Sequence, residues 1–388
     1  MLGFVSMLMD VSSEMIHSVL PIYFVTVLGT STLTVGVVEG IAEATAAITK
    51  VFSGVLADWF GKRKLLMALG YGLAAFTKPV FALADSLGWI IGARFVDRVG
   101  KGIRGAPRDA LIADLAPASL RAASFGLRQS LDTIGAVAGP LAAIFLMWKT
   151  GNDFKLTFWV AVVPAFLSLA LVFAGVREPA LADPPERRAP PLARSELRRL
   201  GSSYWWIVAT GAVLTLARFS EAFLILRAQA AGLPIALAPA IMIAMNVVYA
   251  LAAYPAGALA DKVNRVTVLM FGGVLLIAGD LFLALSSGVG WAVAGVVLWG
   301  LHMAFTQGVF SALIADASPA GLRGTAYGMF NLMSGIAMLA ASAIAGALWD
   351  LSGPRATFLA GAAFAAVALA GLGALRRVNL SRDADGDG

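Results

Sequence analysis

Ionisable side chains recur inside segments of this sequence that are otherwise apolar. Asp10, Glu14 and His17 follow at the i, i+4 and i+7 spacing that places residues on one face of a helix. Glu39 and Glu43 repeat the i, i+4 spacing in the next apolar segment. A charged side chain costs about 2.5 to 3.5 kcal/mol at the centre of a membrane, so such residues usually face a cavity or a partner. The candidates for exchanging protons are Asp10, Glu14, His17, Glu39, Glu43 and Asp132.

Cationic side chains form a second group, mainly between residues 78 and 108. Arg94, Arg98, Lys101 and Arg108 recur at helical spacing along one stripe. Guanidinium and ammonium groups recognise carboxylate or phosphate, so this stripe suits an anionic or zwitterionic molecule. The acidic residues of the first two apolar segments, which we call the acidic face, suit a cation instead. The alternative is that about half of these charges only neutralise their neighbours, because a buried ion left unpaired costs far more than a paired one.

The second half of the sequence holds fewer ionisable residues in its apolar segments. Arg218 and Glu221 lie one helical turn apart and have the alternative of pairing with each other. His302 has the alternative of a single structural hydrogen bond, and Asp280 is isolated. Proton handling is therefore expected mainly in the first half. The candidates for binding a small molecule are Lys78, Arg94, Asp97, Arg98, Lys101, Arg218, Glu221 and His302.

The acidic residues have a metal site as an alternative interpretation. Asp10, Glu14 and His17, completed by Glu39 or Glu43, offer oxygen and nitrogen ligands to a divalent cation. Lone clusters of this kind more often carry protons, and we predict no metal site and no cofactor.

Enzymatic and nucleotide-binding functions find little support. No nucleophile, base and orienting residue occur together, so we predict that the protein is not an enzyme. Residues 100–105 spell the Gly-x-Gly-x-x-Gly fingerprint of dinucleotide sites, but that motif works at a strand-to-helix turn, and here it lies inside an expected helix. The sequence has no cysteine, which removes disulfides and thiolate metal sites from consideration.

The elements that carry these residues are membrane-spanning helices. Hydrophobic residues make up 59% of the 388 residues, charged residues 13%, and the mean hydropathy is +0.83, far from a soluble chain. A helix needs about 20 apolar residues to cross the hydrocarbon core. On that measure the sequence predicts twelve helices, over residues 3–28, 33–57, 65–86, 88–113, 123–148, 154–176, 203–230, 234–260, 266–286, 289–315, 324–349 and 355–376.

Lysine and arginine are distributed unevenly over the loops, which predicts the orientation. The loops on one side of the membrane, together with the C-terminal tail, carry sixteen of these residues: Lys62, Arg63, Lys64, Arg121, Arg177, Arg187, Arg188, Arg194, Arg198, Arg199, Lys262, Arg265, Arg323, Arg376, Arg377 and Arg382. The loops on the other side carry only Lys149, Lys155 and Arg355. Both termini are therefore expected in the cytoplasm, and the net charge of +6 serves topology rather than nucleic-acid binding. Because no basic region precedes the first apolar run, we expect no removable signal peptide.

One loop is long and polar, and it divides six helices from six. It is rich in proline and arginine and cannot span a bilayer. The predicted organisation is an N-terminal six-helix bundle over residues 1–176, a cytoplasmic linker over 177–202, a C-terminal six-helix bundle over 203–376 and a cytoplasmic tail over 377–388, with its acidic end disordered.

A duplicated stretch of sequence supports this division. The twenty-one residues from Ala110, ALIADLAPASLRAASFGLRQS, return from Ala312 as ALIADASPAGLRGTAYGMFNL, with ten positions identical. Each copy lies between two long apolar stretches, so the repeated unit is a multi-helix membrane half.

The sequence resembles the major facilitator superfamily over nearly its whole length. GVLADWFGKRK, from Gly54 to Lys64, is similar to the signature loop of that family, and GALADKVNR, from Gly257 to Arg265, is similar to its degenerate copy. Glycine lets two helices approach closely, and an aspartate four residues on can pair with cations in one conformation and release them in another. The alternative is a basic loop that only sets topology. The resemblance implies gating residues Gly54, Asp58, Gly61, Arg63, Gly257, Asp261 and Arg265.

Two further stretches resemble particular branches of the family. RFVDRVGKG, from Arg94 to Gly102, is similar to a pattern of members driven by a proton gradient, with Arg98 where a small residue is usual. Gly135-Ala-Val-Ala-Gly139-Pro140 resembles the antiporter signature, without the glycines that often follow it. Tight helix packing with a proline kink is the alternative explanation.

The resemblance implies twelve helices in two pseudo-symmetric bundles around a central cavity. It favours a proton-coupled antiporter that exports a small polar or charged molecule by alternating access, as a monomer in the inner membrane. Its partners would be the substrate, protons and the lipid bilayer, and no nucleic acid. The alternatives are a proton-coupled importer of an organic anion, a transporter of a metal ion or metal chelate, and a non-transporting receptor or assembly factor on the same fold.

Overall fold

The protein is helical throughout the part that the computed structural model describes, which is residues 1–60, 62–115, 121–176, 197, 199–319 and 322–385. The helices of the first half are α1 (Leu2–His17), α2 (Leu20–Ile22), the π-helix η1 (Tyr23–Val27), α3 (Thr32–Phe60), α4 (Arg63–Leu83), α5 (Leu87–Leu115), α6 (Arg121–Thr150) and α7 (Phe154–Gly175). Those of the second half are α9 (Ser202–Ala217), α10 (Ala222–Ala230), the short 3-10 helix η3 (Ile235–Leu237), α11 (Ala240–Lys262), α12 (Arg265–Ala284), α13 (Val289–Asp316), α14 (Arg323–Ser352) and α15 (Pro354–Asp385).

Each of the twelve predicted spans corresponds to one helix or to two or three consecutive helical segments, which confirms the predicted fold class. Nine stretches of the described residues are long and apolar enough to cross a membrane by length and composition alone. The other three spans are α1, which is short in itself, and α3 and α5, which carry the acidic and basic faces. The charges that weaken the membrane signal of these helices are therefore the ones that need a functional or structural reason.

The C-terminal helix is longer than predicted. We expected it to end at residue 376 before a tail, whereas α15 continues to Asp385. Neither glycine nor proline interrupts the sequence after Gly373 until residue 386, so nothing in the chain ends the helix sooner.

Two of the spans are broken part-way along. The first leaves α1 after His17 and resumes as α2, with Pro21 in the first turn, where its missing N–H group is harmless. The seventh, which we predicted as one helix over 203–230, separates into α9 and α10 around residues 218–221. The Ser220 hydroxyl accepts a hydrogen bond from the backbone N–H of Ala222 at 3.3 Å and so supports the second start. Ser18 and Ser220 are 202 residues apart, the offset of the duplicated stretch, so both halves break at matching positions.

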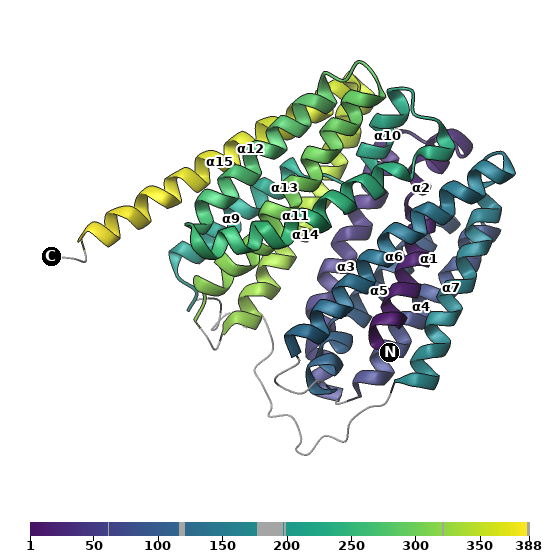
Figure 1. Ribbon diagram of the computed structural model, residues 1–388, viewed down its shortest axis with the longest axis horizontal. Helices are drawn as coiled ribbons and strands as arrows, with labels where there is room; N and C mark the ends of the chain where they lie inside the picture. The colour runs from purple at the N-terminus through teal and green to yellow at the C-terminus, as the bar shows by residue number, and fades with distance from the viewer. Residues whose placement is uncertain (61, 116–120, 177–196, 198, 320–321, 386–388) are drawn as a thin grey trace.

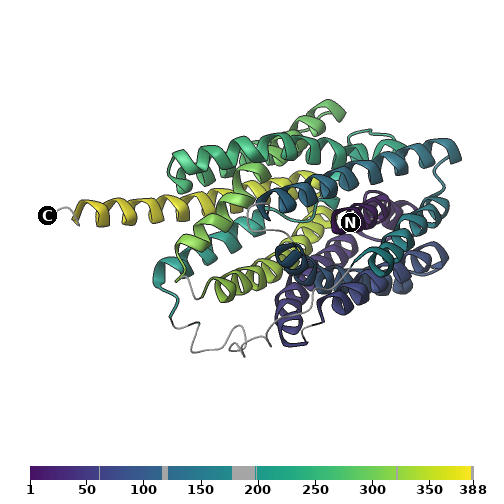
Figure 2. The same cartoon turned by 60° about the horizontal axis from the view of Figure 1, so that its bottom comes forward.

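The helices form two groups that lie side by side, coloured purple to blue and teal to yellow in Figures 1 and 2. In the first group α1 packs on α6 and α7, and α5 packs on α3 and α4. In the second, α13 packs on α11 and α12, and α15 packs on α9 and α12. The groups meet mainly through α3 with α14 and through α6 with α11. These two contacts are equivalent under the duplication, because α11 repeats α3 and α14 repeats α6.

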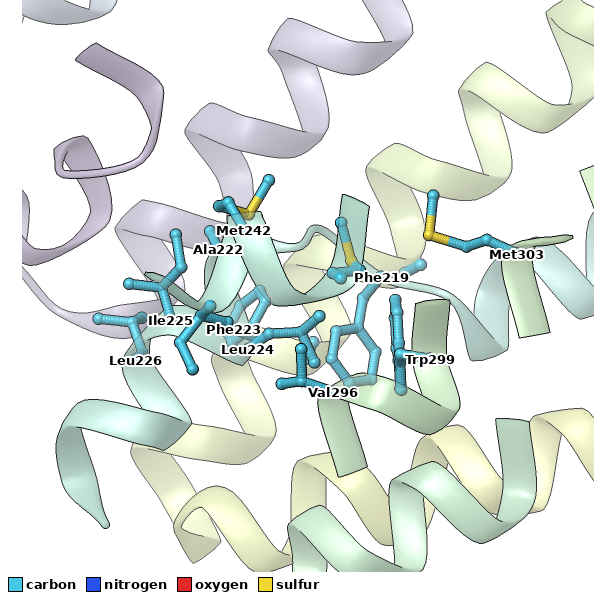
Figure 3. Packing of buried hydrophobic residues seen from close by; sticks show 14 of the residues in the cluster. Phe219, Ala222, Phe223, Leu224, Ile225, Leu226, Met242, Val296, Trp299 and Met303 are labelled. Carbon is cyan, nitrogen blue, oxygen red and sulfur yellow. The ribbon is translucent and has the colours of Figure 1, made fainter. Parts of the chain in front are cut away.

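The core of the second group is aromatic next to the break in its first span. The ring of Phe219 lies 5.4 Å from that of Phe223, 5.7 Å from that of Trp299 and 5.4 Å from that of Phe358. Figure 3 shows Phe219 beside Trp299, with Met242 close by. Such tilted and edge-on ring pairs hold their partners in defined positions, so the broken segment is fixed on one side by packing.

One end of the contact between α3 and α14 is closed by a carboxylate. We call this end of the molecule the far end and the end at which the N-terminus lies the near end (Figure 1). Asp350 of α14 accepts hydrogen bonds from the backbone N–H groups of Thr32 at 3.0 Å and Leu33 at 2.9 Å, and from the Thr32 hydroxyl. The two N–H groups belong to the first turn of α3, where they have no partner within the helix. Asp350 therefore caps α3 from the opposite half of the molecule.

Glycine permits the close approach of these two helices. A β-carbon at Gly346 would lie 2.6 Å from the Leu33 Cα atom, and one at Gly40 would lie 3.0 Å from the Leu339 Cα atom. The first distance is shorter than a β-carbon tolerates and the second is tighter than most such contacts. The two helices therefore approach backbone to backbone, as in other membrane helix pairs rich in small residues.

Candidate functional site

A cavity of about 280 Å³ lies between the two groups of helices. Its wall includes Pro21 and residues 219–222, so it adjoins both broken spans. Phe219, Met242 and Trp299 supply an apolar side from the second group, and Figure 3 shows these three side chains among the buried hydrophobic residues of that group. Nine ionisable side chains line it: Glu14, His17, Glu39, Glu43, Arg94, Arg98, Lys101, Arg218 and Glu221. The cavity thus collects most of the charges that the sequence placed on separate helices.

Arg98 connects three helices at the wall of this cavity. Its Nη2 atom lies 2.8 Å from His17 Nδ1, and its Nη1 atom lies 3.4 Å from Glu43 Oε1. His17 Nε2 in turn lies 3.5 Å from Asp97 Oδ2. A neutral imidazole protonated on Nε2 can donate to Asp97 while Nδ1 accepts from Arg98. Arg98, which departs from the family pattern, is therefore the residue that links α1, α3 and α5.

Two further ion pairs have short contacts between their charged atoms. Arg94 Nη2 donates to Glu39 Oε2 at 2.5 Å, and both side chains are buried. Lys78 Nζ donates to Asp97 Oδ1 at 2.8 Å and to the Ser13 hydroxyl at 3.1 Å. Lys78 and Asp97 are almost fully buried and do not line the cavities described here. The pair of Lys78 with Asp97 fits the structural alternative for part of the charge set, in which buried ions compensate each other.

Four charges at the cavity wall remain without a close partner of opposite sign. Lys101, Arg218 and Glu221 make no hydrogen bond or ion pair with any described residue, and Glu14 approaches only the His17 ring, at 3.9 Å. Arg218 and Glu221, which had the alternative of pairing with each other, do not do so, because the helix is broken between them. The break turns both side chains toward the cavity.

A second cavity of about 240 Å³ adjoins the first and shares Glu43, Arg218, Gln307 and Met338 with it. His302 lies in its wall but is fully buried, and its Nδ1 atom lies 2.9 Å from the Gly272 carbonyl oxygen. That contact is the structural hydrogen bond considered for this histidine.

The isolated carboxyl group of the second half has a partner. Asp280 is fully buried, and its Oδ1 atom accepts a hydrogen bond from Trp299 Nε1 at 2.9 Å. Because the Trp299 ring lines the first cavity, Asp280 holds a cavity wall from behind.

Asp10 and Asp132 lie outside both cavities and closer to the near end. Asp10 is 3.8 Å from Arg104, and Asp132 accepts from Arg128 at 2.5 Å. Arg108, from the same basic stripe, donates to the Ser6 hydroxyl at 2.6 Å. The predicted proton-exchanging set is therefore divided, with Glu14, His17, Glu39 and Glu43 at the cavity and the two aspartates away from it.

The glycines of the antiporter-like sequence lie against α1. A β-carbon at Gly135 would lie 2.7 Å from the Met7 carbonyl oxygen, and one at Gly139 would lie 2.6 Å from the Val11 carbonyl oxygen. Pro140 follows inside α6. The motif thus brings α6 into backbone contact with the helix that carries Glu14, whose Cβ atom is 2.9 Å from the same position at Gly139.

The predicted gating residues are placed only in part. Gly54 and Asp58 belong to the last turns of α3, but Gly61 and the side chains of Asp58 and Asp261 lie outside the described residues. Arg265, at the start of α12, pairs with Asp316 at the end of α13 within the second group. Gly257 is exposed, and a side chain there would meet no atom within 4 Å. Arg63 begins α4.

Several site residues escaped the sequence analysis. Gln307 is a polar residue in an apolar span, which is a signal that could have been used. Asp350 is a charged residue near the end of an apolar span, which is a second such signal. Trp299 and Met338 gave no signal, because aromatic and methionine side chains are common in membrane helices. Among the described residues, no three His, Cys, Asp or Glu side chains gather as potential metal ligands. The Gly-x-Gly-x-x-Gly sequence lies inside α5, as expected, and not at a strand-to-helix turn.

Comparisons with known proteins agree with this architecture. The family model described as Major Facilitator Superfamily matches residues 2–248 and 222–386. An uncharacterized MFS-type transporter of Methanocaldococcus jannaschii is 33% identical over 382 residues, covering 95% of this chain and 92% of the relative. The inner membrane transport protein YajR of Escherichia coli is 26% identical over 389 residues, covering 94% and 80%. The crystal structure of a mutant of the nucleoside transporter NupG superposes with a TM-score of 0.79 at 15% identity, covering 96% of this chain and 98% of that chain. The chain is therefore a multi-pass membrane transporter that belongs to the major facilitator superfamily.

Proposed function

We propose that this protein is a proton-coupled antiporter that exports a small polar or charged molecule by alternating access. The observation that carries the proposal is the cavity between the two groups of helices, which holds the carboxylates of Glu14, Glu43 and Glu221 at its wall. Ionisable groups inside a membrane protein mark substrate and proton pathways, and binding at the interface of two repeats is the arrangement that alternating access requires.

The closed far end supports an arrangement in which the cavity is reached from the near end. The contacts between α3 and α14 run from Thr32, at the far end, to Ala47, whose Cβ atom would lie 3.2 Å from a β-carbon at Gly335. Further along, α3 turns to its own group, where the Ser53 hydroxyl donates to the Gly102 carbonyl oxygen at 3.0 Å. The second cavity lies on this side, lined by Ala47 and Gly335. In this proposal the near end is cytoplasmic, as the lysine and arginine bias predicts.

Coupling follows from competition for the same carboxylates. Glu14 has a half-buried side chain and no cation within ion-pair distance among the described residues except the His17 ring. A proton on Glu14 removes a negative charge that would otherwise hold a cationic group of the substrate, so each occupant favours release of the other. The matching breaks after His17 and around Arg218 place an interrupted helix of each half beside the site. The same proposal includes a monomer in the inner membrane, with both termini in the cytoplasm.

The test is transport by the purified protein in liposomes with an imposed pH gradient, using radiolabelled anions, cations and zwitterions of metabolite size. Glu14→Gln should abolish uptake driven by the pH gradient while substrate exchange at equal pH persists. Asp85→Asn is the matched control, because Asp85 is an exposed carboxylate that pairs with Lys155 at the far end.

The sign of the proton flux separates the alternatives. Protons that move against the substrate support antiport, and protons that move with it would identify an importer instead. Full gradient-driven activity in the Glu14→Gln variant would remove Glu14 from the coupling role.

A further inference from the structure

The charges around the first cavity balance when they are counted by sign. Apart from His17, four cationic side chains and four carboxylates line it, namely Arg94, Arg98, Lys101 and Arg218 against Glu14, Glu39, Glu43 and Glu221. Two of the cations have an ion-pair partner within the wall, since Arg94 lies 2.5 Å from Glu39 and Arg98 lies 3.4 Å from Glu43. The charges of each pair compensate each other, so we assign recognition of the ligand to the other four residues.

These four residues comprise one cation and one carboxylate from each half of the molecule. Lys101 and Glu14 come from α5 and α1, and Arg218 and Glu221 come from the broken segment between α9 and α10. In the described part of the chain, three of them have no hydrogen bond or ion pair, and Glu14 has only the His17 ring at 3.9 Å. Charged groups that are removed from bulk water are strongly unfavourable without compensation, so a ligand that supplies both signs is the one that compensates all four.

A ligand with a single charge would leave the balance unmatched. A monoanion would satisfy Lys101 and Arg218 but leave Glu14 and Glu221 uncompensated, and a monocation would do the reverse. A neutral apolar ligand would displace water from all four without replacing its hydrogen bonds, and a neutral polar ligand would replace hydrogen bonds without compensating any of the charges. The apolar side of the cavity, with Phe219, Met242 and Trp299, can cover a short hydrocarbon chain between two charged ends.

We propose that the substrate is a small zwitterion, held at its anionic end by Lys101 and Arg218 and at its cationic end by Glu14 and Glu221. The proposal rests on the proposed function, because it takes this cavity to be the transport site. The volume of about 280 Å³ sits near the lower limit of ligand pockets, about 300 Å³, and so favours a compact metabolite. Each end of such a molecule bridges the two halves, and binding would therefore draw the halves together around it.

The experiment is equilibrium binding to the purified protein in lipid nanodiscs, by calorimetry, with no pH gradient. The probes are the ω-amino acids β-alanine, γ-aminobutyrate, δ-aminovalerate and ε-aminocaproate, each against the carboxylic acid and the primary amine of the same chain length. We expect at least one ω-amino acid to bind about tenfold or more tightly than both of its singly charged analogues, which is about 1.4 kcal/mol.

Two variants assign the ends of the ligand. Arg218→Gln should lower the affinity of the ω-amino acid toward that of the matching amine, and Glu221→Gln should lower it toward that of the matching acid. Lys155→Gln, which changes an exposed charge at the far end, should leave all affinities unchanged. Elution volume and thermal melting of each variant establish that it is folded.

The proposal fails if no ω-amino acid binds, if an acid or an amine binds as tightly as its zwitterionic counterpart, or if the folded variants keep the full preference. These results are independent of transport. If the zwitterion binds but no proton-driven flux is seen, only the antiport proposal is refuted. If a singly charged molecule is transported by the proton gradient, only the proposal of a zwitterionic substrate is refuted.

Discussion

Removal of the Asp350 carboxylate should shift the protein toward a state that is open at the far end. Asp350 caps α3 from α14 through two backbone N–H groups and one hydroxyl, and these bonds exist only while the two halves are in contact. Loss of a helix cap typically costs about 1 kcal/mol, and Asp350 is exposed, so water recovers part of the lost bonds. One kcal/mol corresponds to roughly a fivefold change in a two-state ratio. We therefore expect Asp350→Ala to raise the ratio of open to closed far ends by up to about fivefold.

The change can be measured as a distance between spin labels. The chain has no cysteine, so Ser86→Cys and Ser287→Cys introduce the only labelling sites, in exposed far-end loops of the first and second groups. Asp350→Ala should enlarge the long-distance fraction in pulsed electron resonance. Asp153→Ala is the control, because Asp153 caps α7 within one half by accepting from the Leu156 N–H group at 3.0 Å. An unchanged distance distribution in Asp350→Ala, or an equal shift in Asp153→Ala, would refute the reasoning.

Two further predictions concern stability. Lys78→Met leaves Asp97 buried without its closest cation and should destabilise the first group by about 3 to 5 kcal/mol, which thermal melting measures. The double variant Lys78→Met/Asp97→Leu should recover much of this stability. An unchanged melting temperature in Lys78→Met would show that the pair is not needed. Gly139→Leu forces a side chain against the α1 backbone and should lower the free energy of unfolding by about 1 to 3 kcal/mol or more. Gly92→Leu is the control, because Gly92 has open space around it, and this variant should melt like the parent protein. Equal melting temperatures of the two variants would contradict close packing at Gly139.

The membrane spans and the charged faces could be predicted from the sequence because both depend on local patterns. A run of about 20 apolar residues has one stable form in a bilayer, and i, i+4 spacing places Glu39 and Glu43 on one face whatever the neighbours are. Because a charged side chain is unfavourable in contact with lipid, such faces are expected to meet inside the protein. The cavity collects Glu14, His17, Glu39 and Glu43 in agreement with this reasoning.

The choice of partners among the charges could not be predicted. Arg94 pairs with Glu39, and Lys78 pairs with Asp97, because of how far each helix is rotated and shifted against the next. Several pairings satisfy the same spacing, and only packing of the surrounding side chains selects between them. The sequence therefore placed Lys78 and Lys101 in one group, although the first is closed in an ion pair and the second is left for a ligand or water.

The break of the seventh span was missed because it lacks the usual signals. Neither glycine nor proline occurs from Arg218 to Glu221, and the apolar pattern continues on both sides. The interruption is stabilised by contacts distant in sequence, such as the hydrogen bond from the Ser220 N–H group to the Ser342 hydroxyl at 3.1 Å and the aromatic packing of Phe219. The matching position in the first span, Ser18 near Pro21, offered the better clue.

The glycine-lined contact of α3 with α14 bears on how readily the transporter can cycle. Long side chains that interlock across a seam lose rotamer freedom each time the seam forms, and that entropy must be regained each time it parts. At Gly40 and Gly346 the facing surface is main chain, which is already ordered within its helix. In the proposed alternating access, rejoining the two halves at these glycines would order few side chains, so the seam would form and separate with a small entropic barrier in either direction.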